Sequence, residues 1–293
     1  MKKIFIYTFL LGFLAACGSG ETATEQTQNQ DQQETEQQEQ QQAIVEVPTE
    51  QKGVYGYYVG MFEAVDYKEN KKPSFSNKIN IAIENISDGE IQGYSVIAGN
   101  KRPFSGTVLQ DGNVYTVEAK EPGDDKYDGV FSFTIDADNE KVEGTWVSND
   151  KNLSVTKRKY DLEKSIFTYD KDLILEESVV QEAFYETYND DDGTFEIPTE
   201  QAMIINASNT ELTAKDVENL YKGDLEIIRN AIYARHGYTF KYRRMRYIFD
   251  KISWYVPLNL EVKDDLTDLE KKNIDLLKRY EKHSEAYYDA YGR

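Results

Sequence analysis

The chain is poor in the residues from which many catalytic centres are built. Its 293 residues include one cysteine and two histidines. An internal disulfide is therefore excluded, and so is a zinc site made of several His and Cys ligands. The sequence contains no HExxH motif, no GxSxG motif and no glycine-rich phosphate loop. We predict neither a metal nor a cofactor. Acidic pairs carry no information on hydrolysis, because 53 acidic residues make any pair unremarkable.

Basic residues are also scarce, since 34 Lys and Arg face 53 Asp and Glu, a formal net charge of −19. The acidic excess lies mainly in two segments. Residues 18–50 carry eight acidic and no basic residues, and residues 161–210 carry thirteen acidic and two basic ones. A chain with this charge is not expected to bind nucleic acid.

The N-terminus has an apolar stretch, Ile4 to Leu14, after two lysines. It is shorter than the ~20 residues that cross a membrane, and it is typical of a signal peptide, here residues 1–16. The sequence Leu14-Ala15-Ala16-Cys17 resembles the lipobox of bacterial lipoproteins. The resemblance implies that Cys17 is acylated after cleavage and anchors the chain to a bacterial membrane outside the cytoplasm. The alternative is a cleaved signal without a lipid.

Residues 17–50 are dominated by Gln, Glu and Thr, and from Glu21 to Gln42 there is no aromatic residue and no Ile, Leu or Val. Such a segment cannot bury a hydrophobic core. We predict a disordered tether between the lipid and the folded domains.

Residues 51–160 alternate between apolar and polar positions, as at Ile79, Ile81 and Ile83, and turn signals separate the runs. We predict about eight antiparallel strands that close into an up-and-down β-barrel. The strands are expected near 55–64, 78–86, 90–98, 103–109, 113–120, 128–135, 141–147 and 152–160. The pattern resembles the avidin and lipocalin barrels, without any specific motif of either family.

Aromatic residues on these strands leave two interpretations open. They could line a ligand pocket or pack in the core. The residues concerned are Tyr55, Tyr57, Tyr94, Tyr115 and Trp146.

Residues 161–210 are predicted to be an acidic connector, and residues 211–293 a small all-α domain, which makes the whole chain α+β. Thr213 and Thr267 each stand three residues before a carboxylate, as in the capping boxes that open helices. A helix is expected from Asp224 to His236, with Gly237 as a left-handed cap. A shorter helix is expected from Tyr242 to Asp250.

The sequence Tyr233-Ala234-Arg235-His236-Gly237 resembles the YARHG domain, a presumed extracellular bacterial module. The agreement extends to other motifs in the order that the family shows. They are Leu212-Thr213, Asp216-Val217, Arg229-Asn230-Ala231-Ile232, Tyr238-x-Phe240, Phe249, Trp254-Tyr255-x-Pro257 and Leu266-Thr267-x-x-Glu270-x-x-Asn273-Ile274. The resemblance names the module and implies no activity.

Helical spacing places Arg229, Tyr233 and His236 on one face, with Asn230 beside them. This face could be a recognition surface or supply a general acid/base. Alternatively, Arg235 and His236 could hydrogen-bond the loop at Trp254-Tyr255 and fix the fold. A separate basic run could bind anions such as phosphate, teichoic acid or glycan, or form a solvated helix face. It consists of Lys241, Arg243, Arg244 and Arg246.

These patterns favour a non-enzymatic, membrane-anchored binding protein of the cell envelope. Its partner could be an envelope glycan, a small molecule or a protein. One rival hypothesis is an envelope hydrolase that uses His236 as acid/base. A second rival is a structural spacer, which would have no well-formed pocket in either domain.

Overall fold

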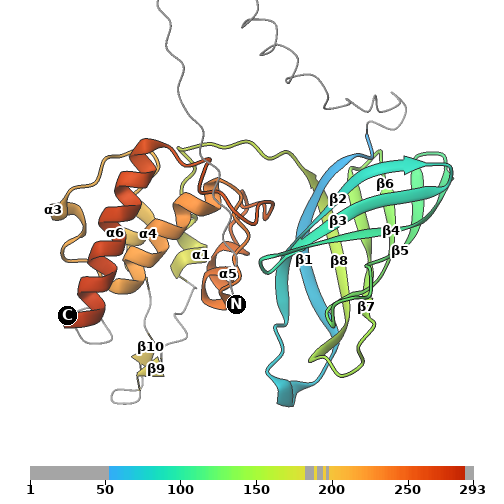
Figure 1. Ribbon diagram of the computed structural model, residues 1–293, viewed down its shortest axis with the longest axis horizontal. Coiled ribbons are helices and arrows are strands. Elements are labelled where there is room, and N and C mark those ends of the chain that lie inside the picture. The colour runs from blue at the N-terminus through green and yellow to red at the C-terminus, as the bar shows by residue number, and fades with distance from the viewer. Residues whose placement is uncertain (1–52, 182–187, 190–193, 196–197, 288–293) are drawn as a thin grey trace, which may run out of the picture. The chain divides into compact units, whose positions relative to one another are not determined.

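The computed structural model describes residues 53–181, 188–189, 194–195 and 198–287 (Figure 1). The predicted signal peptide, Cys17 and the tether lie outside the described residues. No helix in the described ranges is long and apolar enough to cross a membrane.

Eight antiparallel strands form a closed barrel in sequence order, and β1 pairs with β8 to complete it (Figure 1). The predicted barrel is confirmed, with each strand close to its expected position. The strands are β1 Gly56–Tyr67, β2 Ser76–Ser87, β3 Glu90–Ile97, β4 Asn100–Asp111, β5 Val114–Lys120, β6 Gly129–Asp136, β7 Lys141–Ser148 and β8 Val155–Ser165. A 3-10 turn, η2, spans Glu69–Lys71 between β1 and β2.

The barrel interior is packed with its own side chains. Alternate residues of each strand point inward, and large side chains such as Tyr58, Tyr115 and Phe131 are at most 2% exposed. Of the five aromatic residues that left the pocket question open, Tyr115 belongs to this core, whereas Tyr94 and Tyr57 pack together in a separate small cluster. The middle of the barrel is therefore filled.

Strand β2 is buried on both faces from Asn77 to Ile83. The inward face belongs to the barrel core. On the other face, the Asn80 side chain donates a hydrogen bond to the Pro257 carbonyl at 3.0 Å, and Lys78 Nζ donates to the Ile252 carbonyl at 2.6 Å. The backbone of the helical region thus accepts hydrogen bonds from the Asn80 amide nitrogen and the Lys78 ammonium group, whereas the buried Asn80 Oδ1 has no partner within the described residues.

The rest of the described chain consists of helices, the loops that join them and one pair of very short strands. The longer ones are α4 Lys222–Arg235, α5 Arg243–Phe249 and α6 Asp268–Tyr287. The short elements are α1 Glu177–Gln181, α2 Gln201–Ile204, α3 Ala214–Val217, and the paired strands β9 Tyr188–Asn189 and β10 Thr194–Phe195. The helices expected from the two capping boxes and from the apolar pattern after Asp224 are all present. The α+β architecture is confirmed.

Two apolar clusters hold the helices together, and helix α4 contributes to both. One cluster contains Ile227 and Ala231, and the other contains Leu225, Ile228 and Ile232. The first cluster also takes in residues of the predicted connector, Leu175, Val180 and Ala202. Part of the acidic connector is therefore core of the helical region.

Candidate functional site

Helix α4 ends where the sequence provides Gly237. This residue has φ of +71°, which suits glycine, and the Tyr238 N–H donates to the Tyr233 carbonyl at 3.0 Å across the turn. A Cβ at position 237 would lie 3.0 Å from the ring of Phe167. Because the helix ends at Arg235, helical spacing no longer applies to His236, which turns away from the face formed by Arg229 and Tyr233.

His236 is buried against the start of α6. Its Nε2 lies 2.9 Å from Oε2 of Glu270, and its ring stacks on Tyr169, with 4.3 Å between ring centroids. Glu270 also accepts hydrogen bonds from the Tyr169 hydroxyl and from the Thr267 N–H, at 3.1 and 2.9 Å. The side chains of His236 and Glu270 are 5% and 0% exposed. The predicted capping box therefore has a second role, which is to join the end of α4 to the start of α6.

Several donors stabilise the ionised form of Glu270. Burial alone would raise the pKa of its carboxyl group. The hydrogen bonds from His236, Thr267 and Ser208, together with the charge of His236, outweigh burial and lower the pKa to about 2. A group held in this closed network is suited to bracing the fold. Within the described residues, the His236 side chain is only 5% exposed and its Nε2 is engaged by Glu270, whereas acid/base catalysis requires access of a substrate to the ring.

Arg235 also stabilises the turn at Gly237, and its contacts together with those of His236 are called the brace below. Its Nη2 and Nε donate to the Leu173 carbonyl at 2.7 and 2.9 Å, and its guanidinium lies 6.0 Å from the ring centre of Trp254. Trp254 Nε1 donates to the Ile174 carbonyl at 2.7 Å. Arg235 and the Trp254 loop were expected to contact each other by hydrogen bonds. Instead, the side chains of Arg235 and Trp254 both donate to carbonyl groups of the connector, those of Leu173 and Ile174.

Tyr255 is part of the same brace. It is 1% exposed, and its hydroxyl donates to the Tyr238 carbonyl at 2.8 Å. Four of the candidate residues, Arg235, His236, Trp254 and Tyr255, therefore lie in hydrogen-bonded packing around the capped turn at Gly237.

The other three candidates, Arg229, Asn230 and Tyr233, line a groove with a volume of about 710 Å³. Arg229 forms a two-bond ion pair with Glu281 of α6, in which Nη2 lies 2.9 Å from Oε2. Burial would lower the pKa of Arg229, but the hydrogen bond and charge of Glu281 outweigh it and raise the pKa. Asn230 Nδ2 donates to the Glu226 carbonyl at 2.8 Å. One wall of the groove is thereby fixed in place.

The groove combines an apolar floor with a charged rim. Val262, Leu266 and Ile274 form the floor and are 2–7% exposed. The rim carries acidic and basic side chains from α6 and from the preceding loop. They are Glu261, Lys263, Asp264, Lys271, Asp275 and Lys278.

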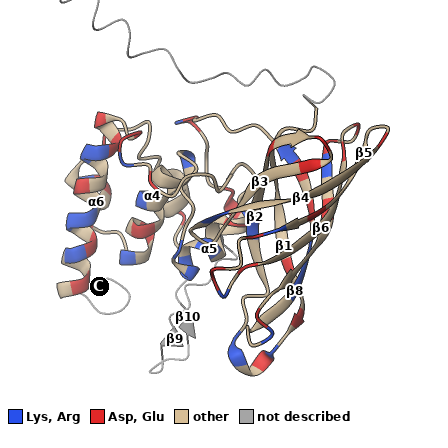
Figure 2. Cartoon of the chain, turned by 45° about the vertical axis from the view of Figure 1, so that its right-hand side comes forward, with Lys and Arg blue, Asp and Glu red and all other residues tan. Residues whose placement is uncertain are grey.

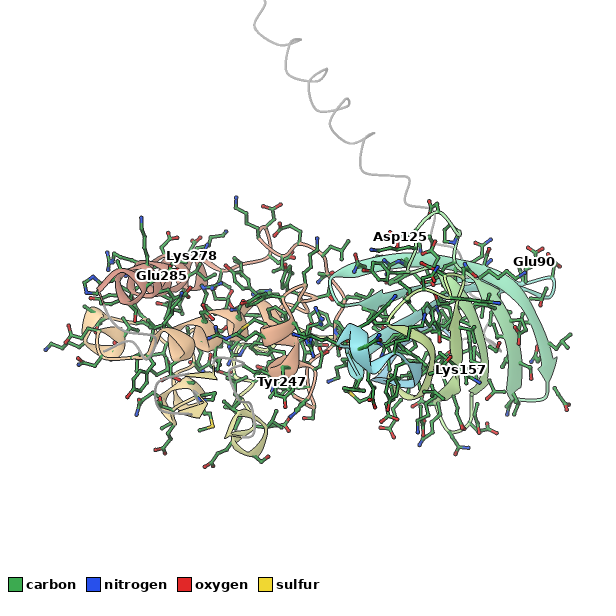
Figure 3. All side chains as sticks on the ribbon, turned by 90° about the horizontal axis from the view of Figure 1, so that it is seen from below. Glu90, Asp125, Lys157, Tyr247, Lys278 and Glu285 are labelled. Carbon is green, nitrogen blue, oxygen red and sulfur yellow. The ribbon has the colours of Figure 1, made fainter. Side chains whose placement is uncertain are left out.

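The rim charges are available to a partner. Lys263, Lys271 and Lys278 form no ion pair with any residue that the structure describes. Figure 2 shows basic and acidic residues interspersed along α6, and Figure 3 shows Lys278 on the outside of that helix. The neighbouring Lys272 differs, because it pairs with Glu211 and does not line the groove.

The basic run does not form one uniform surface. Lys241 and Arg243 are exposed, whereas Arg244 pairs with Glu226 at 3.2 Å. Arg246 is half-buried and donates to the Lys241 carbonyl. An anion patch made of all four residues remains a prediction.

Sequence reasoning did not identify the contribution of α6 to the groove. The signal was present, because Lys271, Asp275 and Lys278 follow the i, i+4, i+7 spacing of one helix face. This face is charged, and a charged helix face is usually a solvated one, so the spacing alone does not indicate a binding surface.

Comparison with known proteins identifies the helical region. Residues 201–282 match the YARHG domain. The match confirms the resemblance seen in the motif and begins ten residues before the boundary expected at residue 211. No curated protein matches the chain.

Proposed function

We propose that this protein is a membrane-anchored extracytoplasmic binding protein whose YARHG domain holds a segment of a partner protein in the groove between α4 and α6. The observation that carries the proposal is the groove itself. It joins motif residues Arg229 and Tyr233 to an apolar floor and to a rim of charged side chains, whose three lysines form no ion pair within the described residues. Binding sites on proteins commonly combine an apolar centre with a polar rim in this way.

A polypeptide suits the groove better than a small apolar ligand does. The rim presents three lysines and three acidic residues, so it complements a segment that carries both charges. The floor can receive an apolar side chain from the same segment.

The closed surroundings of His236 weigh against the hydrolase hypothesis. The groove weighs against a pure spacer, which needs no such surface. The proposed location outside the cytoplasm is supported by the signal-like N-terminus and by the YARHG domain.

The groove can be tested by site-specific photo-crosslinking in the bacterium that makes the protein. A crosslinking residue at position 271 should give a defined protein adduct, and the same residue at position 272 should give none. Lys278→Glu should remove the adduct at 271 because it reverses a rim charge. Equal adducts at 271 and 272, or none at 271, would contradict the proposal.

The anchor is tested separately, because acylation needs the thiol of Cys17. Cys17→Ser should abolish labelling by palmitate and release the folded protein from the membrane fraction. A variant that still takes up label and stays with the membrane would show that Cys17 is not the anchor.

A further inference from the structure

The barrel has a cavity at one end, where β1 leads to β2, β3 to β4, β5 to β6 and β7 to β8. Its volume is about 380 Å³, which is within the usual size range of ligand pockets. Phe62, Trp146 and Leu153 supply apolar surface, and Arg158 and Glu121 supply charge. Below it, contacts of Phe62 with Trp146 and Tyr160, each at 5.8 Å between ring centroids, close the barrel.

Arg158 is a buried cation that has no counter-ion among the residues that the structure describes. Its side chain donates to the Phe62 and Ser74 carbonyl groups, both at 2.8 Å, and its guanidinium lies 5.1 Å from the centre of the Phe62 ring. Arg158 forms no ion pair within the described residues, and burial lowers its pKa to about 10. A guanidinium has five N–H groups, so three remain without a protein partner in the described part of the chain.

A second arginine lines the same cavity. Arg246 of α5 has a buried Nε atom that meets no hydrogen-bond partner in the described ranges of the chain. Unsatisfied buried donors are costly, and an anion would satisfy them.

The acidic group of the cavity is already engaged and does not neutralise Arg158. Glu121 accepts hydrogen bonds from Trp146 Nε1 at 3.0 Å and from the Gly129 N–H at 2.7 Å, and the cation that acts on its carboxyl group is Arg102. Arg102 in turn pairs with Asp128 at 3.3 Å and with Asp125, which is labelled in Figure 3.

We propose that this barrel cavity binds a small amphiphilic anion. Its anionic group is bound by Arg158 and Arg246, and its apolar body lies against Phe62, Trp146 and Leu153. The ligand class is a carboxylate, sulfonate or phosphate with an aromatic or short aliphatic body. This site is independent of the groove in the YARHG domain.

The test uses the full chain and 8-anilinonaphthalene-1-sulfonate, a fluorescent amphiphilic anion. The wild type should bind one probe molecule saturably. Arg158→Gln should weaken binding about tenfold or more, because it removes charge-assisted hydrogen bonds. The uncharged probe N-phenyl-1-naphthylamine should bind more weakly to the wild type and should be unaffected by Arg158→Gln. Arg279→Gln, at an exposed position of α6, is the matched control and should bind the anionic probe as the wild type does.

A second variant tests the same cavity in case Arg158→Gln fails to fold. Ser154 lines the cavity, and its side chain makes no hydrogen bond within the described residues. Ser154→Phe should fill the cavity and weaken probe binding similarly, with an unchanged near-ultraviolet circular dichroism spectrum. Displacement of the probe by decanoate indicates a free carboxylate, and displacement by phosphatidylglycerol vesicles indicates a lipid headgroup. A wild type that binds no probe, or a folded Ser154→Phe that binds as the wild type does, would overturn the proposal.

Discussion

The barrel and the helical region reach their folds by different kinds of contact. In the barrel, strands that follow one another in the sequence also pair, and alternation within each strand determines which side chains face the core. In the helical region, the turn at His236 depends on Glu270, Tyr169 and Leu173, which are 34 to 67 residues away. Local patterns therefore describe the first region almost completely and the second only in part.

This difference predicts that the helical region is the more sensitive to loss of one polar side chain. Glu270→Ala would leave His236, the Tyr169 hydroxyl and the Thr267 N–H without their acceptor. Removing one member of a buried network leaves the other polar groups without a hydrogen-bond partner. We therefore expect a loss of about 3–5 kcal/mol in the free energy of unfolding. Urea denaturation of the full chain measures it. Glu211→Ala, which breaks the exposed pair with Lys272, is the control and should cost little. A similar small loss for both would show that the network does not hold the fold.

In the barrel, the positions most sensitive to substitution are glycines that lie against the backbone of a neighbouring strand. A Cβ at Gly106 would lie 1.9 Å from the Glu118 carbonyl oxygen on the paired strand β5. Gly106→Ala should therefore force the strands apart and cost about 1–3 kcal/mol, as overpacking does. Gly112→Ala is an informative comparison, because its Cβ would meet nothing within 4 Å, and only the backbone, with φ of +59°, is strained. Thermal unfolding followed by circular dichroism should rank Gly106→Ala as the more damaging variant. The opposite ranking would contradict the close approach of β4 and β5.

A smaller effect concerns pH and a polar contact between β2 and α5. Asp250 accepts the Lys78 N–H at 2.9 Å, and burial raises the pKa of its carboxyl group to about 7, against the effects of this hydrogen bond and of the nearby Arg246. The folded protein therefore binds this proton more tightly than the unfolded chain, in which the pKa is about 4. As the pH rises from about 4 to 7, this group lowers the stability.

Asp250→Asn removes this titration and keeps an oxygen that can accept the Lys78 N–H. The variant should gain stability relative to the wild type as the pH rises through that window, and the gain should level off above about pH 7. Melting temperatures from pH 4 to 8 measure it. A gain that is the same at every pH would mean that Asp250 titrates normally in the folded protein.

The sequence predicted the secondary-structure elements well, but it did not predict which distant residues form hydrogen bonds with one another. The capping box at Thr267 located Glu270 correctly, because its spacing of three residues is a local signal. Nothing local shows that the same carboxylate accepts a hydrogen bond from His236, which lies 34 residues earlier. The hydrogen-bond partners of the connector were not predicted for a similar reason, since its acidic composition does not show that the Leu173 carbonyl accepts two donors of Arg235. The barrel cavity depends on which strand ends meet, and this follows only from the closed register.

The most direct test of the account separates the two halves of the YARHG motif, because His236 is assigned to the brace and the α4–α6 groove to binding. Unfolding free energy and crosslinking at position 271 should be measured together for His236→Ala and Lys278→Glu. We expect His236→Ala to lose about 1–3 kcal/mol and to keep the crosslink while folded. Lys278→Glu should change stability by no more than about 0.5 kcal/mol and lose the crosslink. A His236→Ala variant that unfolds like the wild type but loses the crosslink would contradict this division and make His236 the binding residue.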